Sequence, residues 1–521
     1  VVEATDVSLA VEPPVDVPTD EQGIVDLHAA MIDRLHQDVP NLNVGGPCMA
    51  WPVFSKWNYD HFRDRMGRFI DQLGDRTDFL SWHIYSTFYD DGDTESHSVG
   101  ANADWQLDLV ENYAWNQTGR EIPVMISEFG GGFKSGTTWH DAYSPQRDWY
   151  VLKSVMGKTM AFHERPDRIT KAIPFIVEKA SWFAGYQTNP YPWVTYRWVG
   201  GAWQETHLTK FFAFWKDVDG DRFPIQSTDP DVQVHAFVTN ATVHVCLNKV
   251  DAFKSAEGSL ATLLESGMSV QSATRTRLYW DGSEPVLETQ VPLAVWTNLT
   301  LEAEEAAIVH LTLNQAPSRS AQCIQKSHYG DRTMVPYTGT PERFVVEADM
   351  HRGAIHRAQL KVGVTRAHGA SIAPLVSFNG HSLAQATDWP GGLQQGVSGG
   401  DGGRDQFDGS IRMNVPTAWI QATNSVDVSF TGAGGHISTV ILDLTSELPF
   451  DFTIVAEAGP SDLVMCWDSS TAFDYVVRES PDLSPGSWTP VATLPGTGAP
   501  MCFTNETVNP RAYYRVEAVY P

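Results

Sequence analysis

The sequence has no long apolar run and comparatively little positive charge. None of its 521 residues falls in an uninterrupted apolar stretch of about 18 residues, which excludes a membrane-spanning helix. Lys and Arg together number 36 against 63 Asp and Glu, so the formal net charge is −27. A surface this acidic repels phosphate groups and anionic lipids. We therefore expect neither a nucleic acid nor a membrane as a partner.

Cysteine is scarce too, and no two cysteines form a Cys-x-x-Cys pair. The five cysteines are Cys48, Cys246, Cys323, Cys466 and Cys502. This number is too small for a disulfide scaffold, and the spacing does not suit a zinc site. Cys466 and Cys502 lie close together in one small segment, and they can pair if the protein is exported. An odd number of cysteines leaves at least one free thiol.

Apolar and aromatic side chains are plentiful. A hydrophobic content of 42 % over this length is enough to bury several cores, which excludes a disordered chain, and the length suggests three or four domains. The chain contains 18 Trp, 16 Tyr and 24 Phe. Aromatic faces beyond the needs of a core suit stacking on sugar rings, although packing inside cores accounts for most of them.

The first 220 residues alternate between helical and strand patterns. Apolar residues at helical spacing predict helices at 21–37, 59–73, 104–115, 147–162 and 208–215. Short apolar runs between them predict strands at 42–47, 78–85, 123–128 and 171–177, apolar on both faces as buried parallel strands are. Strands that alternate with helices indicate a parallel sheet with right-handed crossovers.

Polar and aromatic residues follow each predicted strand, which favours a (β/α)₈ TIM barrel, because the carboxyl ends of barrel strands form its catalytic face. The alternative is an open α/β sheet, but no glycine-rich phosphate loop follows any strand. Only four strands and a fragment at residues 1–4 are found, which corresponds to a barrel from the end of strand four onward. Either another polypeptide supplies strands one to three, or the given chain lacks its natural N-terminus, since it opens on Val1 without a signal peptide.

Beyond about residue 220 the pattern changes to short strands with a period of two, separated by turn residues. This pattern is typical of β-sandwiches. We place a first β-sandwich at 221–316, a second at 317–446 and a small C-terminal β module at 447–521. The expected fold class is therefore α/β plus all-β: a (β/α)₈ barrel over 1–220, followed by β-sandwich domains.

Glu128 is the strongest candidate for chemistry. It ends a predicted strand and is followed by Phe129 and three glycines, so its carboxylate is expected at the barrel mouth, where a ligand can approach the backbone. Glycoside hydrolysis needs two carboxylates, about 5 Å apart in a retaining enzyme. If Glu128 is the nucleophile, Glu3 is the natural acid/base candidate and Asp6 the alternative. A salt bridge or a helix cap is the structural alternative for Glu128.

Other side chains suit a sugar-binding cleft. His83 and Tyr85 lie two residues apart on one predicted strand and so point to the same side. A tyrosine beside the nucleophile can donate a hydrogen bond that keeps the carboxylate ionised, whereas a core histidine is the alternative for His83. Glu178 ends the last predicted strand and can hold a sugar hydroxyl. The remaining candidates lie in loops, where they can stack on or cover a sugar, or simply pack the loops: Trp51, Trp182, Trp139 and His140.

Three segments in this order resemble glycoside hydrolase family 86, which holds β-agarases and β-porphyranases: residues 44–47 (VGGP), 78–85 (DFLSWHIY) and 126–130 (ISEFG). The resemblance covers about residues 1–220, and the next two β segments fit the family's sandwich domains. It implies a (β/α)₈ barrel, a retaining mechanism with Glu128 as nucleophile, and endo-acting cleavage of β-1,4-galactosidic bonds in red-algal galactans. The family's acid/base lies in an Asn-Glu-Pro context, where this sequence has Val2, Glu3 and Ala4.

We expect a polysaccharide as the substrate, and net acidity favours neutral agarose. Sulfated porphyran is the alternative, because four cations are available to meet sulfate: Lys56, Lys134, Lys179 and Arg197. A catalytically impaired carbohydrate-binding protein is the alternative from another class, and it would bind the polysaccharide without releasing reducing ends.

No cofactor is required by this chemistry, and no metal site is expected. Asp217, Asp219 and Asp221 alternate but lack the downstream Glu of an EF-hand loop, so we expect a solvated acidic turn, with a structural calcium ion as the alternative. The terminal module resembles β domains appended to exported bacterial enzymes, and a strongly acidic protein suits a salty medium. The expected location is therefore secreted or on the cell surface of a marine-type bacterium.

Overall fold

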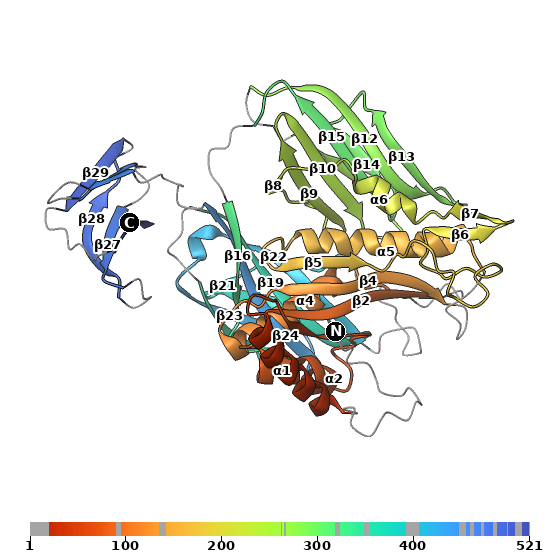
Figure 1. Cartoon of the computed structure of the whole chain (residues 1–521), viewed down its shortest axis with the longest axis horizontal. Helices are drawn as coiled ribbons and strands as arrows, with labels where there is room; N and C mark the ends of the chain where they lie inside the picture. The colour runs from red at the N-terminus through yellow and green to blue at the C-terminus, as the bar shows by residue number, and fades with distance from the viewer. Residues whose placement is uncertain are drawn as a thin grey trace.

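The structure is a computed structural model that describes most of the chain (Figure 1). The described residues are 20–89, 95–134, 142–261, 263–264, 267–317, 323–348, 354–391, 406–447, 455–458, 463–469, 474–482, 487–497, 499–505 and 513–519. Glu3, Asp6, Trp139 and His140, which the sequence analysis singled out, lie outside these ranges. In the described part, no helix has the length and apolar character that a membrane crossing needs.

The first part of the chain is a parallel α/β unit, as the alternating pattern predicted. Its sheet has the strand order β1-β2-β4-β5, all paired in parallel, and the short β3 pairs antiparallel with β2. The strands are β1 (Gly45–Met49), β2 (Phe79–Tyr89), β3 (Glu95–Ser96), β4 (Val124–Lys134) and β5 (Ile169–Pro174). The helices are α1 (Glu21–Asp38), α2 (Asp60–Phe62), a π-helical turn η1 (Arg63–Gly67), α3 (Arg68–Leu73), α4 (Ala101–Thr118), α5 (Pro145–His163) and α6 (Thr209–Trp215).

Local signals in the sequence set the ends of these helices. Asp20 caps α1, because its carboxylate accepts a hydrogen bond from the Gly23 amide at 2.7 Å. Ser144 caps α5, with Pro145 at the first position, where a missing N–H costs nothing. Gly119 ends α4 in a left-handed conformation. The predicted helices are therefore found within about three residues of their expected ends.

The four predicted strands are found, but their bounds differ from the predictions. β1 begins three residues later than expected, and β2 and β4 continue four and six residues further, to Tyr89 and Lys134. β5 ends at Pro174, whereas the apolar run predicted a strand over 171–177, because the Ile176 amide turns back to the Pro174 carbonyl at 2.8 Å. The expectation that every strand is apolar and buried on both faces is also wrong for β5. Thr170 and Lys171 are exposed, since β5 lies at the end of the described strand order.

A six-stranded antiparallel sheet covers α5 (Figure 1). Its strand order is β13-β12-β15-β10-β9-β8, and β11 pairs with β14 beside its other face. Cys246 and Ile308 on one face join the core of the α/β unit, while the alternate residues Val245 and Val309 face the β11–β14 side. The strands are β8 (Asp221–Phe223), β9 (Val232–Thr239), β10 (Thr242–Lys249), β11 (Ala256–Ser259), β12 (Val270–Trp280), β13 (Pro285–Pro292), β14 (Asn298–Leu301) and β15 (Ala306–Leu313).

A second pair of sheets packs on α4. One sheet has the order β16-β24-β19-β22 with β17 beside β24, and the other has the order β18-β23-β20-β21, with a shared apolar core. On the outer face of the first sheet, the indole of Trp105 in α4 donates to Ser438 at 2.9 Å. The strands are β16 (Cys323–Tyr329), β17 (Val335–Pro336), β18 (Glu342–Glu347), β19 (Ile355–Ala367), β20 (Leu375–Phe378), β21 (His381–Ser382), β22 (Gln406–Val415), β23 (Thr423–Ser429) and β24 (His436–Glu447).

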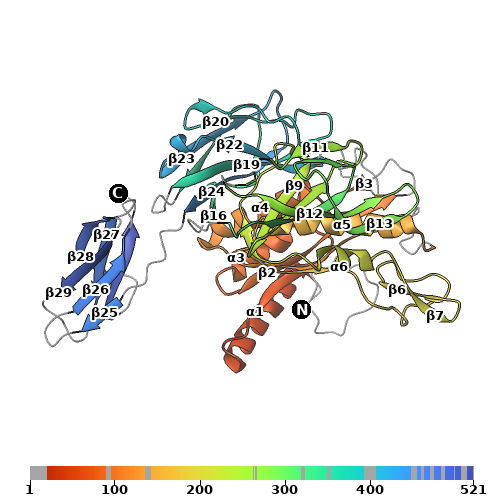
Figure 2. The same ribbon diagram turned by 90° about the horizontal axis from the view of Figure 1, so that it is seen from above.

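The last described residues form a small β module that lies apart from the other sheets in both views (Figures 1 and 2). It has two sheets of three strands, β25-β26-β29 and β28-β27-β30. The Cys466–Cys502 disulfide joins β26 to β29, as the sequence analysis allowed for an exported protein, and the other three cysteines form no disulfide. The strands are β25 (Val455–Ala458), β26 (Leu463–Asp468), β27 (Asp474–Ser480), β28 (Thr489–Pro495), β29 (Pro500–Asn505) and β30 (Tyr513–Val519).

A buried ionic network joins α4 to the rest of the molecule. Arg165, which follows α5 and is 2 % exposed, contacts three carboxylates one turn apart on α4: Asp104 at 3.2 Å, Asp108 at 2.6 Å and Glu111 at 3.1 Å. Asp108 also accepts from Lys361 of β19 at 2.8 Å and from Ser410 of β22 at 2.6 Å. Burial alone would raise the pKa of Asp108, but Lys361 and Arg165 outweigh burial and hold it well below its usual range.

Removing the carboxylate at the centre of this network should be costly. We expect Asp108→Ala to lower the free energy of unfolding by about 3–5 kcal/mol, because Arg165 and Lys361 lose a shared buried partner. Urea unfolding followed by tryptophan fluorescence measures the change. The control is Asp38→Ala, which removes an exposed ion pair with Arg34 and should cost less than about 1 kcal/mol. Equal losses in the two variants would show that the buried network does not stabilise the fold.

Candidate active site

The strands β1, β2 and β4 lie side by side, and their regular pairing is interrupted within the sheet. The prediction that Glu128 ends a strand is wrong, because β4 continues to pair with β2 as far as Lys134. Between β2 and β4 the register passes from Trp82 opposite Ile126 to His83 opposite Glu128, so Ser127 is an extra residue in β4. Between β1 and β2 it skips Cys48, whose φ is +58°. Such β-bulges occur near active sites because they redirect side chains that a regular strand would alternate between its faces.

Glu128 is held from β2 by two side chains. The Tyr85 hydroxyl donates a hydrogen bond of 2.7 Å to Glu128 Oε2, and His83 Nδ1 lies 3.3 Å from the same oxygen. The side chain of His83 is only 5 % exposed, whereas that of Glu128 is 29 % exposed. The carboxylate is thus fixed from the buried side and open to a ligand from the other.

A row of aromatic rings extends from the loop after β1 to the loops after β5. Trp51 lies 5.1 Å from Tyr85, Tyr85 lies 6.2 Å from Phe175, and Phe175 lies 6.4 Å from Tyr191, measured between ring centroids. Trp182 continues the row at 5.1 Å from Tyr191. Trp51 and Trp182 at the two ends are 53 % and 69 % exposed, so their faces are available to a flat ligand.

Two members of this row were missed from the sequence. Phe175 follows the last residue of β5, so the position directly after the strand was a usable signal. Tyr191 lies in a loop with no pattern of its own. Burial and the nearby charge of Glu128 both raise the pKa of Tyr191, which places its hydroxyl within electrostatic reach of that carboxylate.

The other predicted residues lie elsewhere. Glu178 does not end a strand as expected: it comes after β5, its side chain is 72 % exposed, and it pairs with Lys179 at 2.9 Å. Asp217, Asp219 and Asp221 are exposed, and Asp219 accepts from the adjacent Gly220 amide at 2.8 Å. Within the described ranges, no three His, Cys, Asp or Glu side chains are arranged to hold a metal ion.

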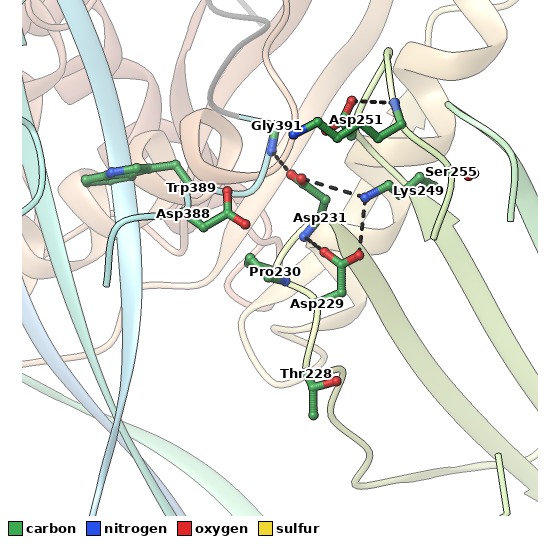
Figure 3. A pocket seen from close by; sticks show the side chains of 11 residues that line it. Thr228, Asp229, Pro230, Asp231, Lys249, Asp251, Ser255, Asp388, Trp389 and Gly391 are labelled. Carbon is green, nitrogen blue, oxygen red and sulfur yellow. Dashed lines mark hydrogen bonds and ion pairs between the residues drawn. The ribbon is translucent and has the colours of Figure 1, made fainter. Parts of the chain in front are cut away.

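A cavity of about 370 Å³ lies away from Glu128, between β9–β10 and the segment before residue 391 (Figure 3). Lys249 lies between Asp229 at 3.3 Å and Asp231 at 3.7 Å. Asp231 also accepts from the Gly391 amide at 2.7 Å. These polar groups pair with one another, and they join the first sandwich to the segment of the second sandwich that ends at Gly391. We therefore interpret the lining as a structural connection between the two sandwiches. The sequence analysis did not predict it.

Comparisons with known proteins identify the sheets that follow the α/β unit. The family profile of porphyranase β-sandwich domain 1 matches residues 231–334, and that of the β-porphyranase A C-terminal domain matches residues 346–445. Funoran endo-β-hydrolase from Wenyingzhuangia aestuarii is 29 % identical over 433 residues, which cover 81 % of this chain and 57 % of that protein. The chain thus spans just over half the length of this relative.

Two solved structures share the fold. BuGH86, solved in complex with neoagarooctaose, superposes with a TM-score of 0.76 at 25 % identity, over 84 % of this chain and 70 % of that one. A family 86 β-porphyranase from the human gut bacterium Bacteroides plebeius superposes with a TM-score of 0.72 at 24 % identity, over 82 % and 74 % of the two chains. A parallel α/β unit that carries an accessible carboxylate, followed by two porphyranase-type sandwiches, is an arrangement that this chain shares with these glycoside hydrolases. The comparisons thus support the resemblance to glycoside hydrolase family 86 that the three sequence segments indicated.

A buried acid, Asp148, lies at the start of α5. Asp148 Oδ2 accepts from the His207 amide at 2.9 Å and from the Tyr143 hydroxyl at 3.2 Å. Burial raises the pKa of Asp148 to about 7, although Arg147 acts in the opposite direction. The folded protein therefore keeps a proton on Asp148 at pH values where the unfolded chain, with an ordinary pKa of about 3.9, has lost it.

This proton makes stability depend on pH. Because the folded state binds more protons than the unfolded state, the contribution of Asp148 is fully present below about pH 4 and is lost as the pH rises to about 7. When the pH rises from 4.5 to 8, the unfolding free energy of the parent should fall by a few kcal/mol more than that of Asp148→Asn, which has no carboxyl group to titrate at this position. Urea unfolding across this range measures it, with the exposed Asp75→Asn as control. Parallel pH profiles for the parent and Asp148→Asn would contradict the raised pKa.

Proposed function

We propose that this chain is part of a retaining endo-glycoside hydrolase that cleaves β-1,4-galactosidic bonds of a red-algal galactan, with Glu128 as the nucleophile. The observation that carries the proposal is the position of Glu128 next to the bulge in β4, held at one oxygen by Tyr85 and His83 and partly open to solvent. A nucleophilic carboxylate has to be fixed in position and accessible from one side, and this arrangement meets both needs.

We further propose that β1, β2, β4 and β5 are strands five to eight of a (β/α)₈ barrel. Their parallel pairing in chain order, with helices between them, supports this assignment, as does the likeness to BuGH86. In such a barrel the carboxyl ends of the strands form the catalytic face. That face would then hold Glu128, His83 and Tyr85 together with the aromatic row.

The mechanism needs a second carboxylate, for which we propose Glu3, with Asp6 as the alternative. An oxygen of Glu128 attacks the anomeric carbon while the bond from that carbon to the leaving oxygen breaks, and the acid/base donates its proton to that oxygen. The same residue, now ionised, takes a proton from water, which attacks the anomeric carbon and releases Glu128. No cofactor enters either step.

Agarose is the proposed substrate. Trp51 and Trp182, whose faces are exposed at the two ends of the aromatic row, suit stacking on neutral sugar rings. Two of the four cations that could meet a sulfate are engaged instead: Lys179 pairs with Glu178, and the Arg197 guanidinium lies 3.8 Å from the centre of the Tyr143 ring. BuGH86, which was solved with neoagarooctaose, supports the same substrate class. The Cys466–Cys502 disulfide supports secretion or display on the cell surface.

Replacing the proposed nucleophile should abolish cleavage. We expect Glu128→Gln to reduce the release of reducing ends from agarose to background, because an amide cannot form the glycosyl-enzyme. The matched control is Glu121→Gln, an exposed residue near the other end of the same strand, which should retain the parent rate. Porphyran is assayed in parallel, and faster release from porphyran than from agarose would overturn the substrate preference. Undiminished release by Glu128→Gln would overturn the assignment of the nucleophile.

Removing the hydroxyl that holds Glu128 should slow the reaction without abolishing it. We expect Tyr85→Phe to lower kcat about 10- to 100-fold with a smaller change in KM, since a hydrogen bond to a charged group contributes about 1.5–3 kcal/mol. Steady-state kinetics on agarose oligosaccharides measures both constants. Tyr196→Phe is the control, because it removes a hydroxyl bonded to Glu205 in the hairpin of β6 (Tyr196–Val199) and β7 (Ala202–Glu205). Equal effects in the two variants would argue against a role for Tyr85 at Glu128.

A further inference from the structure

A cluster of small polar side chains lies behind His83, on the side away from Glu128. Cys48 Sγ is 3.7 Å from His83 Nε2 and 3.1 Å from Ser127 Oγ. The Ser81 hydroxyl donates to Ser127 Oγ at 2.8 Å. Cys48, Ser81 and His83 are at most 4 % exposed as residues, so these groups are buried and satisfy one another there.

The backbone is irregular at two of these residues. Cys48 and Ser127 are the residues that the strand registers skip, and Cys48 has a left-handed conformation that is uncommon for a residue other than glycine. Both bulges flank β2, which carries Ser81 and His83 on one face because they are two residues apart. Strained backbone of this kind persists where surrounding structure requires it, and here it brings Cys48 and Ser127 into contact.

We infer that Ser81, Ser127 and Cys48 form a chain of hydrogen-bond donors that fixes the tautomer of His83 and thereby positions Glu128. An ionised carboxylate only accepts hydrogen bonds, so the ring nitrogen that faces it, Nδ1, has to carry a proton. A neutral imidazole with its proton on Nδ1 has a bare Nε2, which needs a donor. Cys48 is placed to supply that donor.

The direction of the whole chain follows from this end point. Each hydroxyl and each thiol has one proton to give. If the Cys48 thiol donates to His83, then Cys48 accepts from Ser127, and Ser127 in turn accepts from Ser81. The last step agrees with the 2.8 Å hydrogen bond that Ser81 donates to Ser127. The reversed chain would place the bare lone pair of Nδ1 against the carboxylate at 3.3 Å, where two acceptors repel. Cys48 and Ser127 are therefore positioning residues that act through His83.

Cys246 offers a matched control, because it is another buried cysteine far from this cluster. Burial raises the pKa of the Cys246 thiol to about 12, and the residue packs in the core between β10 and α5. Replacing it tests the general effect of losing a buried thiol. Cys48→Ser keeps a group with one proton and a lone pair, whereas Cys48→Ala removes both.

The test uses the full chain with ¹⁵N-labelled histidine, with the His83 signal identified by its loss in His83→Gln. We expect the parent and Cys48→Ser to show the Nδ1–H tautomer of His83, and Cys48→Ala to show a mixture with Nε2–H. On agarose, Cys48→Ala should lower kcat about tenfold with KM changed less than about twofold, while Cys48→Ser and Cys246→Ala stay within about threefold of the parent.

An Nε2–H tautomer in the parent would overturn the inference, as would a Cys48→Ala variant that keeps both the Nδ1–H tautomer and the parent kcat. The role in catalysis rests on the proposed function of Glu128. The tautomer of His83 does not depend on that function. The NMR result therefore tests the donor chain even if the parent releases no reducing ends. Urea unfolding of each variant verifies that it is folded before either measurement is interpreted.

Discussion

The arrangement of this molecule depends on the buried guanidinium of Arg165 and the carboxylates that it joins on α4. A charge taken out of water is costly unless it is paired, so each member of the network fixes the positions of the others. Arg165 follows α5, Asp104, Asp108 and Glu111 lie along α4, and Lys361 comes from the second sandwich. The network thus ties α4 and the residue that follows α5 to the sheet that packs on α4.

This constraint reaches the candidate site through the strands that the helices support. α4 lies in the chain between β2 and β4, and α5 between β4 and β5, so fixing both helices fixes the two strands in which Tyr85 and Glu128 meet. The sandwiches bury the outer faces of α4 and α5. In an ordinary surface helix, the face opposite the core is exposed to solvent instead. The β domains therefore brace the α/β unit that carries the candidate site.

Much of the fold could be predicted because its signals are local. The caps at Asp20 and Ser144 and the turn at Gly119 mark helix ends, and the position of Cys466 and Cys502 in one small segment made their pairing possible. The bulges that bring Cys48 and Ser127 together could not be predicted, since an extra residue in a strand shows only against its partner strand. Tyr191 and the partners of Asp108 were missed for the same reason: their contacts come from distant parts of the chain.

The central claim is that Glu128 is the nucleophile of a retaining glycoside hydrolase. A 2-deoxy-2-fluoro galactosyl substrate with a good leaving group slows hydrolysis of the glycosyl-enzyme more than its formation, so the covalent species accumulates. Intact mass followed by peptide mapping then locates it. The account predicts one sugar adduct per chain, on the peptide that contains Glu128. An adduct on another carboxylate, or turnover with inverted anomeric configuration and no adduct, would contradict it.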